Sequence, residues 1–169
     1  MRKYMIKNNS AFTLMEILVV IAIIGVLSTV VMASLSSARG RSINASIKSS
    51  LANARAQGEL FQATNTLGYL GICLPANSSG GEESIRRFFD VAHQASGATS
   101  LTDVQSTAQS GTTMSACHAS GSGWAISVPL KVPEVSGATT YYYFCVDSIG
   151  SAVSRVSPLG SGAIVCPAT

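Results

Sequence analysis

The feature that most constrains this chain is an uncharged run near its N-terminus, ILVVIAIIGVLSTVVMASLSSA, which extends from Ile17 to Ala38. The run is longer than the about 20 mostly apolar residues that a membrane-spanning helix needs. A single carboxylate, Glu16, stands directly before it. A carboxylate at the centre of a bilayer costs about 2.5–3.5 kcal/mol on insertion scales, so an acidic residue here indicates a functional role and calls for a partner.

The residues that lead into the run form a motif, Ala11-Phe12-Thr13-Leu14-Met15-Glu16, behind a short basic leader. This motif, followed by a long apolar helix, resembles the N-terminus of type IV pilins and pseudopilins. The resemblance implies cleavage between Ala11 and Phe12 by a prepilin peptidase and N-methylation of the new Phe12 amine. It also implies that Glu16 pairs with the Phe12 amine of a neighbouring subunit during assembly. The family usually has glycine before the cut, where this chain has Ala11.

A secretory signal peptide is the main alternative for this region. It would have a basic start, an apolar core from Ile17 to Leu27, and a small-residue cleavage site at Val31-Met32-Ala33. A signal peptide has no use for Glu16, and the helical pattern continues past Ala33, so we favour the pilin interpretation. If the segment were a signal peptide, the protein would belong to another class: a secreted, disulfide-stapled binding module released after Ala33.

Beyond the run, the helix is expected to continue with a different pattern. Apolar residues recur there at spacings of three and four, which gives one apolar stripe on a helix. The stripe consists of Ile43, Ile47, Leu51, Ala54, Gly58 and Phe61. The sequence thus predicts one helix from Phe12 to about Ala63, about 78 Å long at 1.5 Å per residue. Its first half is apolar all round and its second half is amphipathic.

Two further segments come before the predicted sheet. A short helix is predicted from Glu82 to Ala95, because apolar residues fall at i, i+3, i+4 and i+7 from Ile85. From Gly97 to Gly123 the chain is rich in Ser, Thr, Ala and Gly. We expect a long surface segment there, with at most a weak helix near Thr102 to Gln109.

The period then changes to two, which is typical of a half-buried strand. Strands are predicted at Trp124–Val132, Thr139–Asp147 and Ala152–Ser157, followed by a loop from residue 158 to 169. Pro129 favours a sheet edge for the first of them. The predicted fold class is α+β: a long N-terminal helix packed on a small antiparallel β-sheet head, which the resemblance implies is pilin-like.

The chain is expected to divide into a leader at residues 1–11, a transmembrane and filament-core helix at 12–38, and a head at 39–169 that includes the second half of the long helix.

The formal charge of +3 comes from the leader. Once Arg2, Lys3 and Lys7 leave, eight basic residues face eight acidic ones. This balance argues against general nucleic-acid binding. The basic leader puts the N-terminus in the cytoplasm and the head outside.

Four cysteines lie beyond the run: Cys73, Cys117, Cys145 and Cys166. They would face a compartment in which disulfides persist, and three pairings are possible. Local loop closure favours Cys73–Cys117 and Cys145–Cys166. The second pair also resembles the C-terminal disulfide of many pilins. No CxxC spacing is present, which argues against structural zinc.

The sequence offers little catalytic chemistry. His93 and His118 are the two histidines, and we interpret both as structural or solvated. We predict no catalytic residue, no cofactor and no metal ligand. Asn44-Ala45-Ser46 and Asn77-Ser78-Ser79 fit an N-glycosylation pattern, which is weak evidence in a chain this rich in Asn and Ser.

These observations predict a subunit of a type IV pilus-like filament rather than an enzyme. As the resemblance implies, its partners would be a prepilin peptidase, membrane lipid before assembly, and other pilin subunits, with minor pilins as further candidates. It would wait in the bacterial cytoplasmic membrane before joining an extracellular filament. Adhesion, motility and DNA uptake are roles that follow from the resemblance alone. The nearest alternative is a pseudopilin of a type II secretion or DNA-uptake machine.

Overall fold

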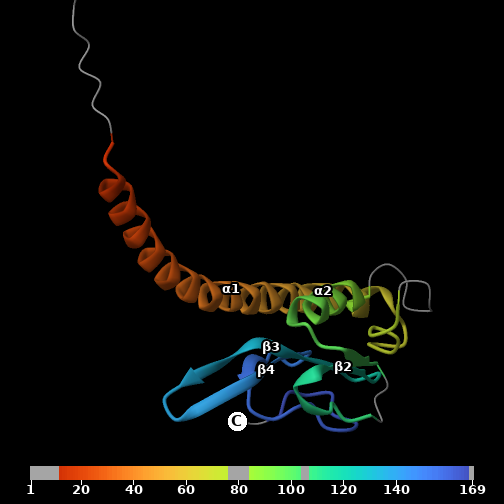
Figure 1. Ribbon diagram of the computed structural model, residues 1–169. Helices are drawn as coiled ribbons and strands as arrows, with labels where there is room; N and C mark the ends of the chain where they lie inside the picture. Colours follow the sequence, from red (N-terminus) through yellow and green to blue (C-terminus); the bar gives the residue numbers. More distant parts are fainter. Residues whose placement is uncertain (1–11, 76–83, 104–106, 168–169) are drawn as a thin grey trace, which may run out of the picture. The chain divides into compact units, whose positions relative to one another are not determined.

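The computed structural model describes residues 12–75, 84–103 and 107–167, except for the side chain of residue 33. Its elements are α1 (Leu14–Thr64), α2 (Arg86–Ser96), β1 (Ser100–Thr102), the 3-10 turn η1 (Gly111–Thr113), β2 (Met114–Ala119), β3 (Trp124–Ser136), β4 (Thr139–Asp147) and β5 (Ala152–Arg155) (Figure 1). The chain separates into two compact units, residues 1–39 and 40–169.

In the first unit, α1 leaves its apolar side chains uncovered. The exposed ones are Leu14, Met15, Ile17, Leu18, Val19, Val20, Ile21, Ile23, Ile24, Val26, Leu27, Val30, Val31, Met32 and Leu35. The hydroxyls of Ser28 and Thr29 donate to the carbonyls of Ile24 and Val26 at 2.8 Å each, so the helix satisfies them internally. Within the described residues, α1 is the one helix long and apolar enough to cross a membrane.

In the second unit, the predicted stripe of α1 faces the core. Ile47, Leu51, Ala54 and Phe61 are buried, and Ile43 packs half-buried against the same cluster. The helix begins and ends within two residues of the predicted bounds. Periodicity therefore predicted both the length of α1 and the face that it buries.

Two glycines let β3 approach α1 closely. A Cβ on Gly58 would lie 2.9 Å from the Trp124 indole, and one on Gly40 would lie 2.6 Å from Cγ1 of Val132. Real Cβ atoms do not come this near to other atoms, so a larger residue at either position would push the strand away. The two contacts also show that β3 runs antiparallel to this part of α1.

The second helix is shorter than predicted. It begins at Arg86 instead of residue 82, with Ile85 as the residue before the helix, and ends at Ser96. Gly97 follows with a φ of 76°, a left-handed conformation that glycine adopts readily at a helix C-terminus. Ile85, Phe89 and Ala92 are buried as the spacing predicts. Residues 82 and 83, expected in the first turn, lie outside the described residues.

The five strands form one sheet in the order β1-β2-β3-β4-β5, in which β1 and β2 are parallel and the other pairs antiparallel. The prediction of a surface segment from Gly97 to Gly123 is wrong, because this segment contributes β1 and β2. Ser115, Ala116, Cys117 and His118 are buried. Neither Thr102, which lies in β1, nor residues 107–109 are helical. The strands were not predicted because their side chains are small and polar. These residues are buried because β2 pairs with β3, and not because the segment is hydrophobic.

The prediction of an edge position from Pro129 is also wrong, because β3 is the central strand. The pairing of β3 with β2 ends at Ser127, however, so at Pro129 the paired neighbour is β4, through Tyr143. The missing amide of proline therefore interrupts no β2 ladder. The register with β4 shifts between Pro129 and Glu134, which marks an irregularity at this point.

The sheet is covered on two sides, and the prediction of half-buried strands underestimated this. All seven residues from Trp124 to Leu130 are buried. One cluster joins the α1 stripe to alternate residues of β3 and β4. A second, smaller cluster consists of Ala116, Ala125, Cys145, Leu159 and Cys166. The C-terminal loop thus covers positions that alternation assigns to water. The fold class remains the predicted one, a long helix packed on a mostly antiparallel sheet.

Candidate processing and assembly site

The first turn of α1 is closed by two side chains of the motif. The Thr13 backbone N–H and hydroxyl donate to Oε2 of Glu16 at 2.9 and 3.0 Å, and the Glu16 N–H donates to the Thr13 hydroxyl at 3.3 Å. This reciprocal arrangement is a capping box, in which the threonine precedes the helix and the glutamate lies three residues later. It satisfies donors at the helix start, where no carbonyl of the helix is available.

Thr13 is therefore a residue of this site that the sequence prediction did not include. The resemblance implies a partner for Glu16 in a neighbouring subunit, and the structure shows one within the chain, Thr13. The signal was present, because Thr-x-x-Glu before an apolar run is a recognised capping pattern. Phe12 is 77% exposed, and Ala11 lies outside the described residues.

The surface next to this capped turn is apolar. The large apolar side chains of α1 from Leu14 to Leu35 are exposed. Each methylene that moves from water to an apolar environment gains about 0.8 kcal/mol, so leaving this long segment in water is unfavourable. Such a helix needs a lipid environment or other apolar helices. Glu16 stands at its start, with its carboxylate already accepting two hydrogen bonds.

A family model described as the prokaryotic N-terminal methylation motif matches residues 6–32. The chain carries the N-terminal signature of a prepilin. Type IV pilins and pseudopilins share this signature, which spans Ala11, Phe12 and Glu16 and most of the uncharged run. No curated protein and no solved structure matches the chain.

The prepilin signature has consequences for the class of protein. It implies processing by a prepilin peptidase and assembly with other subunits that carry the same kind of stem. It suggests a structural subunit rather than an enzyme. Together with the apolar helix, it fits membrane insertion.

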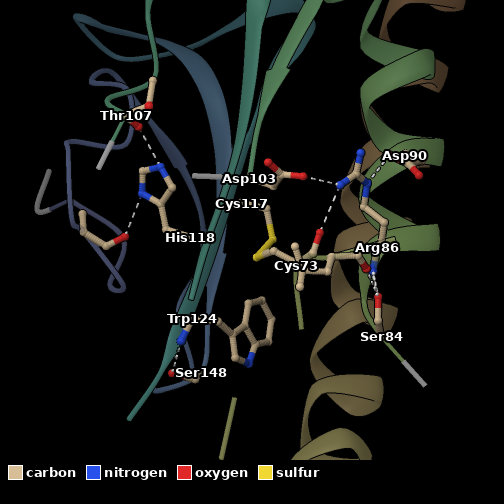
Figure 2. The surroundings of a disulfide bond; sticks show 12 residues. Cys73, Ser84, Arg86, Asp90, Asp103, Thr107, Cys117, His118, Trp124 and Ser148 are labelled. Carbon is tan, nitrogen blue, oxygen red and sulfur yellow. Dashed lines mark hydrogen bonds and ion pairs between the residues drawn. A yellow bond between two sulfur atoms is a disulfide. The ribbon is translucent and has the colours of Figure 1, made fainter. Parts of the chain in front are cut away.

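The head is held by two disulfides, Cys73–Cys117 and Cys145–Cys166, which are the pairs that local loop closure favours. Figure 2 shows the first of them next to Arg86 of α2. The Arg86 guanidinium donates to Asp90 at 2.8 Å, to Asp103 at 2.9 Å and to the Cys73 carbonyl at 3.1 Å. This arginine therefore ties α2 to the loop that precedes it and to the end of β1.

The second disulfide is reinforced by a buried carboxylate. Asp147 accepts the backbone N–H groups of Ile149 and Ser151 with one oxygen, at 3.2 and 2.8 Å. Its other oxygen accepts the N–H of Cys166 at 2.9 Å. Asp147 thus fixes the β4–β5 turn and the C-terminal loop together, beside the Cys145–Cys166 bond.

Both histidines make contacts inside the fold. His118 is buried, with Nε2 2.8 Å from the Thr107 carbonyl and Nδ1 3.2 Å from that of Ala163. His93 bonds through Nδ1 to the Ser115 hydroxyl at 3.0 Å. Burial lowers the pKa of His93 below its ordinary value, although nearby Asp90 acts in the opposite direction. These contacts give both rings a structural role. Among the described residues, no group of three or more His, Cys, Asp or Glu could hold a metal ion.

Asn44 has a structural role, which makes it a poor glycosylation acceptor. Its side chain is buried and donates to the Val132 carbonyl at 2.8 Å, while its Oδ1 accepts the N–H of Lys131 at 2.8 Å. It thereby serves backbone groups of β3 where the pairing with β4 is irregular. The second glycosylation pattern, at residue 77, lies outside the described residues.

Next to Asn44, an ion pair joins α1 to the sheet. Nζ of Lys48 lies 2.8 Å from Oε2 of Glu134, which also accepts the hydroxyl of Ser154 at 2.8 Å. Partial burial by itself raises the pKa of Glu134. Hydrogen bonds from Lys48 and Ser154 and the charge of Lys48 outweigh it, so this pKa lies below its ordinary value.

Proposed function

We propose that this chain is a subunit of a type IV pilus-like filament. A prepilin peptidase would remove residues 1–11 by cleavage between Ala11 and Phe12, and the Phe12 amine would be methylated. The subunit would then wait in the cytoplasmic membrane, with residues 12–38 as its span. Assembly would transfer this helix from lipid into a bundle of stems, with the heads, residues 39–169, on the outside.

The observation that carries this proposal is the combination of a prepilin signature with a helix that its own chain leaves uncovered. The signature ends at residue 32, within the apolar part of α1. The same part has exposed side chains on every turn from Leu14 to Leu35. A secreted module would lose this segment, whereas a filament subunit would use it.

A registry role for Glu16 follows from its position. A carboxylate buried among apolar stems costs several kcal/mol without a partner and much less with one. The methylated Phe12 amine of an adjoining subunit would be a cation at the required level of the stem. The next basic side chain along the chain is Arg39, more than twenty residues away. Pairing would therefore favour one stagger between subunits, and Oε1 of Glu16 could accept the amine N–H while Oε2 keeps the hydrogen bonds from Thr13.

The disulfides support the proposed topology, because such bonds persist outside the cytoplasm. The head would accordingly face the exterior and the leader the cytoplasm. A pseudopilin of a secretion or DNA-uptake machine would share the signature, the span and this orientation. It differs from a pilin subunit in whether long filaments leave the cell.

Intact-mass measurement of the mature protein tests the proposal directly. We expect a chain that starts at Phe12, carries one added methyl group and has two disulfides. A chain that starts at Ser34 would refute the proposal and support a secreted module. The amount of mature protein in sheared extracellular filaments, against the amount in membranes, separates a pilin subunit from a pseudopilin.

A further inference from the structure

The hairpin formed by β3 and β4 extends beyond the rest of the sheet. The pairing of β3 with β2 ends at Ser127, and the pairing of β4 with β5 ends at Tyr143. Past these residues each strand has the other as its one paired neighbour in the sheet, and Figure 1 shows the hairpin reaching well beyond β2. Its turn is tight, since Ser136 pairs with Thr139 and Gly137 has a φ of 61°. A two-residue turn with glycine first suits the twist of a hairpin.

The course of β3 along α1 gives the direction of this hairpin. Trp124 lies against Gly58 and Val132 lies against Gly40. The helix segment is about 27 Å long at 1.5 Å per residue. The strand segment is about 26 Å long at 3.3 Å per residue. The two therefore run side by side, and β3 points toward the beginning of the head.

Gly40 follows Ala38, the last residue of the uncharged run, by two positions, which is about 3 Å along a helix. The contact of Gly40 with Val132 thus lies near the end of the proposed span, whatever the tilt of the head. The hairpin continues past Val132, and the four residues of strand to Ser136 reach at most about 13 Å further. The tip can therefore reach the lipid headgroups of an inserted subunit.

The chemistry of the tip suits that environment. Val135 is 71% exposed and Tyr142 is 38% exposed. Glu134 is the one charged residue from 133 to 142, and Lys48 pairs with it. Tyrosines concentrate at membrane interfaces, where the ring is buried and the hydroxyl stays wet. Arg41, exposed in α1 one residue after Gly40, could meet lipid phosphates at the same level.

We infer that the tip of the β3–β4 hairpin, residues 133–142, is a second membrane contact of the unassembled subunit, seated in the interface between headgroups and acyl chains. The inference rests on the proposed insertion of residues 12–38 and adds to it. The head would be held at the membrane at two points instead of one, which restricts its rotation about the stem before assembly.

Tryptophan quenching by brominated lipid tests this contact in the full chain. The chain is reconstituted at one copy per lipid nanodisc, in phosphatidylcholine brominated near the headgroup end of the acyl chains. Val135→Trp is the probe. Ile149→Trp is its matched control, because Ile149 is 72% exposed in the β4–β5 turn, near Arg55 and away from Gly40. The native Trp124 is fully buried and supplies a common background.

We expect brominated lipid to quench the added emission of Val135→Trp at least about twofold, since an interfacial ring lies beside the upper acyl chains. Ile149→Trp should change little. Equal quenching of the two variants would overturn the inference. A change in Val135→Trp that needs two chains per disc would overturn it too, in favour of docking onto a second copy.

A third variant separates failure of this inference from failure of the proposed function. Ile24 lies well inside the uncharged run, so Ile24→Trp, measured in phosphatidylcholine brominated deeper in its acyl chains, must be quenched if the span is inserted. Strong quenching at Ile24→Trp with none at Val135→Trp would refute the hairpin contact and leave the insertion standing. Absence of quenching at Ile24→Trp would refute both.

Discussion

The two halves of α1 are one continuous helix with opposite relations to the rest of the chain. Ile21, in the first half, is 62% exposed, whereas Ile47, in the second, is fully buried. The residue type and the backbone are the same, and what differs is the presence of a sheet. The sheet of the same chain covers the apolar side chains of the second half, whereas those of the first half are left for lipid or other subunits to cover.

The difference follows from the pattern of charges along the helix. Before Arg39 the uncharged run has apolar residues on every face, so no single face could be turned toward a core. After it, polar residues such as Lys48 and Arg55 leave one stripe for the sheet. A chain can thus encode, within one element, a part that folds alone and a part that waits for an assembly.

The largest effect is expected from the charge at the start of the uncovered half. Glu16→Ala should leave insertion and cleavage largely intact and reduce filament formation by more than about tenfold, because an interaction that favours one stagger would be lost. Processed protein in membranes and sheared filaments outside cells measure the two steps separately.

Glu16→Gln separates the charge from the cap. Its amide oxygen can still accept hydrogen bonds from Thr13, so the start of the helix should survive, while the ion pair with a neighbour cannot form. We therefore expect Glu16→Gln to lose filaments nearly as Glu16→Ala does. Normal filament yield from both variants would contradict the registry role and leave Glu16 as a helix cap.

In the head, removal of the disulfide that closes the longer loop should have the largest effect on stability. Cys73→Ser combined with Cys117→Ser opens a loop of 44 positions, for which the chain-entropy model gives about 4 kcal/mol. The matched pair, Cys145→Ser with Cys166→Ser, opens a loop of 21 positions and should cost about 3 kcal/mol. Urea unfolding followed by the emission of Trp124 measures both, and the reverse order would contradict the loop-closure argument.

Two leucines of α1 provide the most direct comparison of the halves. Leu51 is buried in the core, so Leu51→Ala should lower the free energy of unfolding of the head by about 2–5 kcal/mol. Leu27 is exposed in the first half, so Leu27→Ala should leave the unfolding of the head unchanged within about 0.5 kcal/mol. The same urea titration, carried out on the full chain in detergent micelles, compares the two. A large effect of Leu27→Ala would mean that the stem supports the head.

The smallest expected effect concerns pH. The folded pKa of Glu134 is lowered, so the stabilisation from its ionised form is fully present above the unfolded pKa and is lost as pH falls through the folded one. Glu134→Gln should flatten the decline in head stability below about pH 4.5, by at most about 1 kcal/mol for a partly exposed pair. Lys48→Met should flatten it similarly. Urea midpoints measured from pH 7 to pH 3 give the slopes, and an unchanged slope in both variants would argue against this ion pair.

Much of this architecture could be predicted from local sequence patterns. The extent of α1, the buried stripe around Leu51 and the full length of β4 all follow from periodicity or from the density of β-forming residues. The processing motif is equally local, because Ala11, Phe12 and Glu16 lie within six residues of one another in the sequence. Even the Thr13–Glu16 cap could be predicted, because the two residues are three positions apart as in a capping box.

Other features depended on partners far away in the chain. β2 is made of small and polar residues and is buried because β1 and β3 flank it and Cys117 is bonded to Cys73. Ala125, which alternation assigned to water, is covered by Leu159 in the C-terminal loop.

The sequence by itself therefore determined where the chain is apolar and with what period, since these are properties of neighbouring residues. Only the tertiary structure decided which polar strands are buried, that β3 is central despite Pro129, and that its hairpin points along α1 toward Gly40. The physical reason is that burial and strand order are settled by the sum of many contacts between distant segments, and no local window contains them.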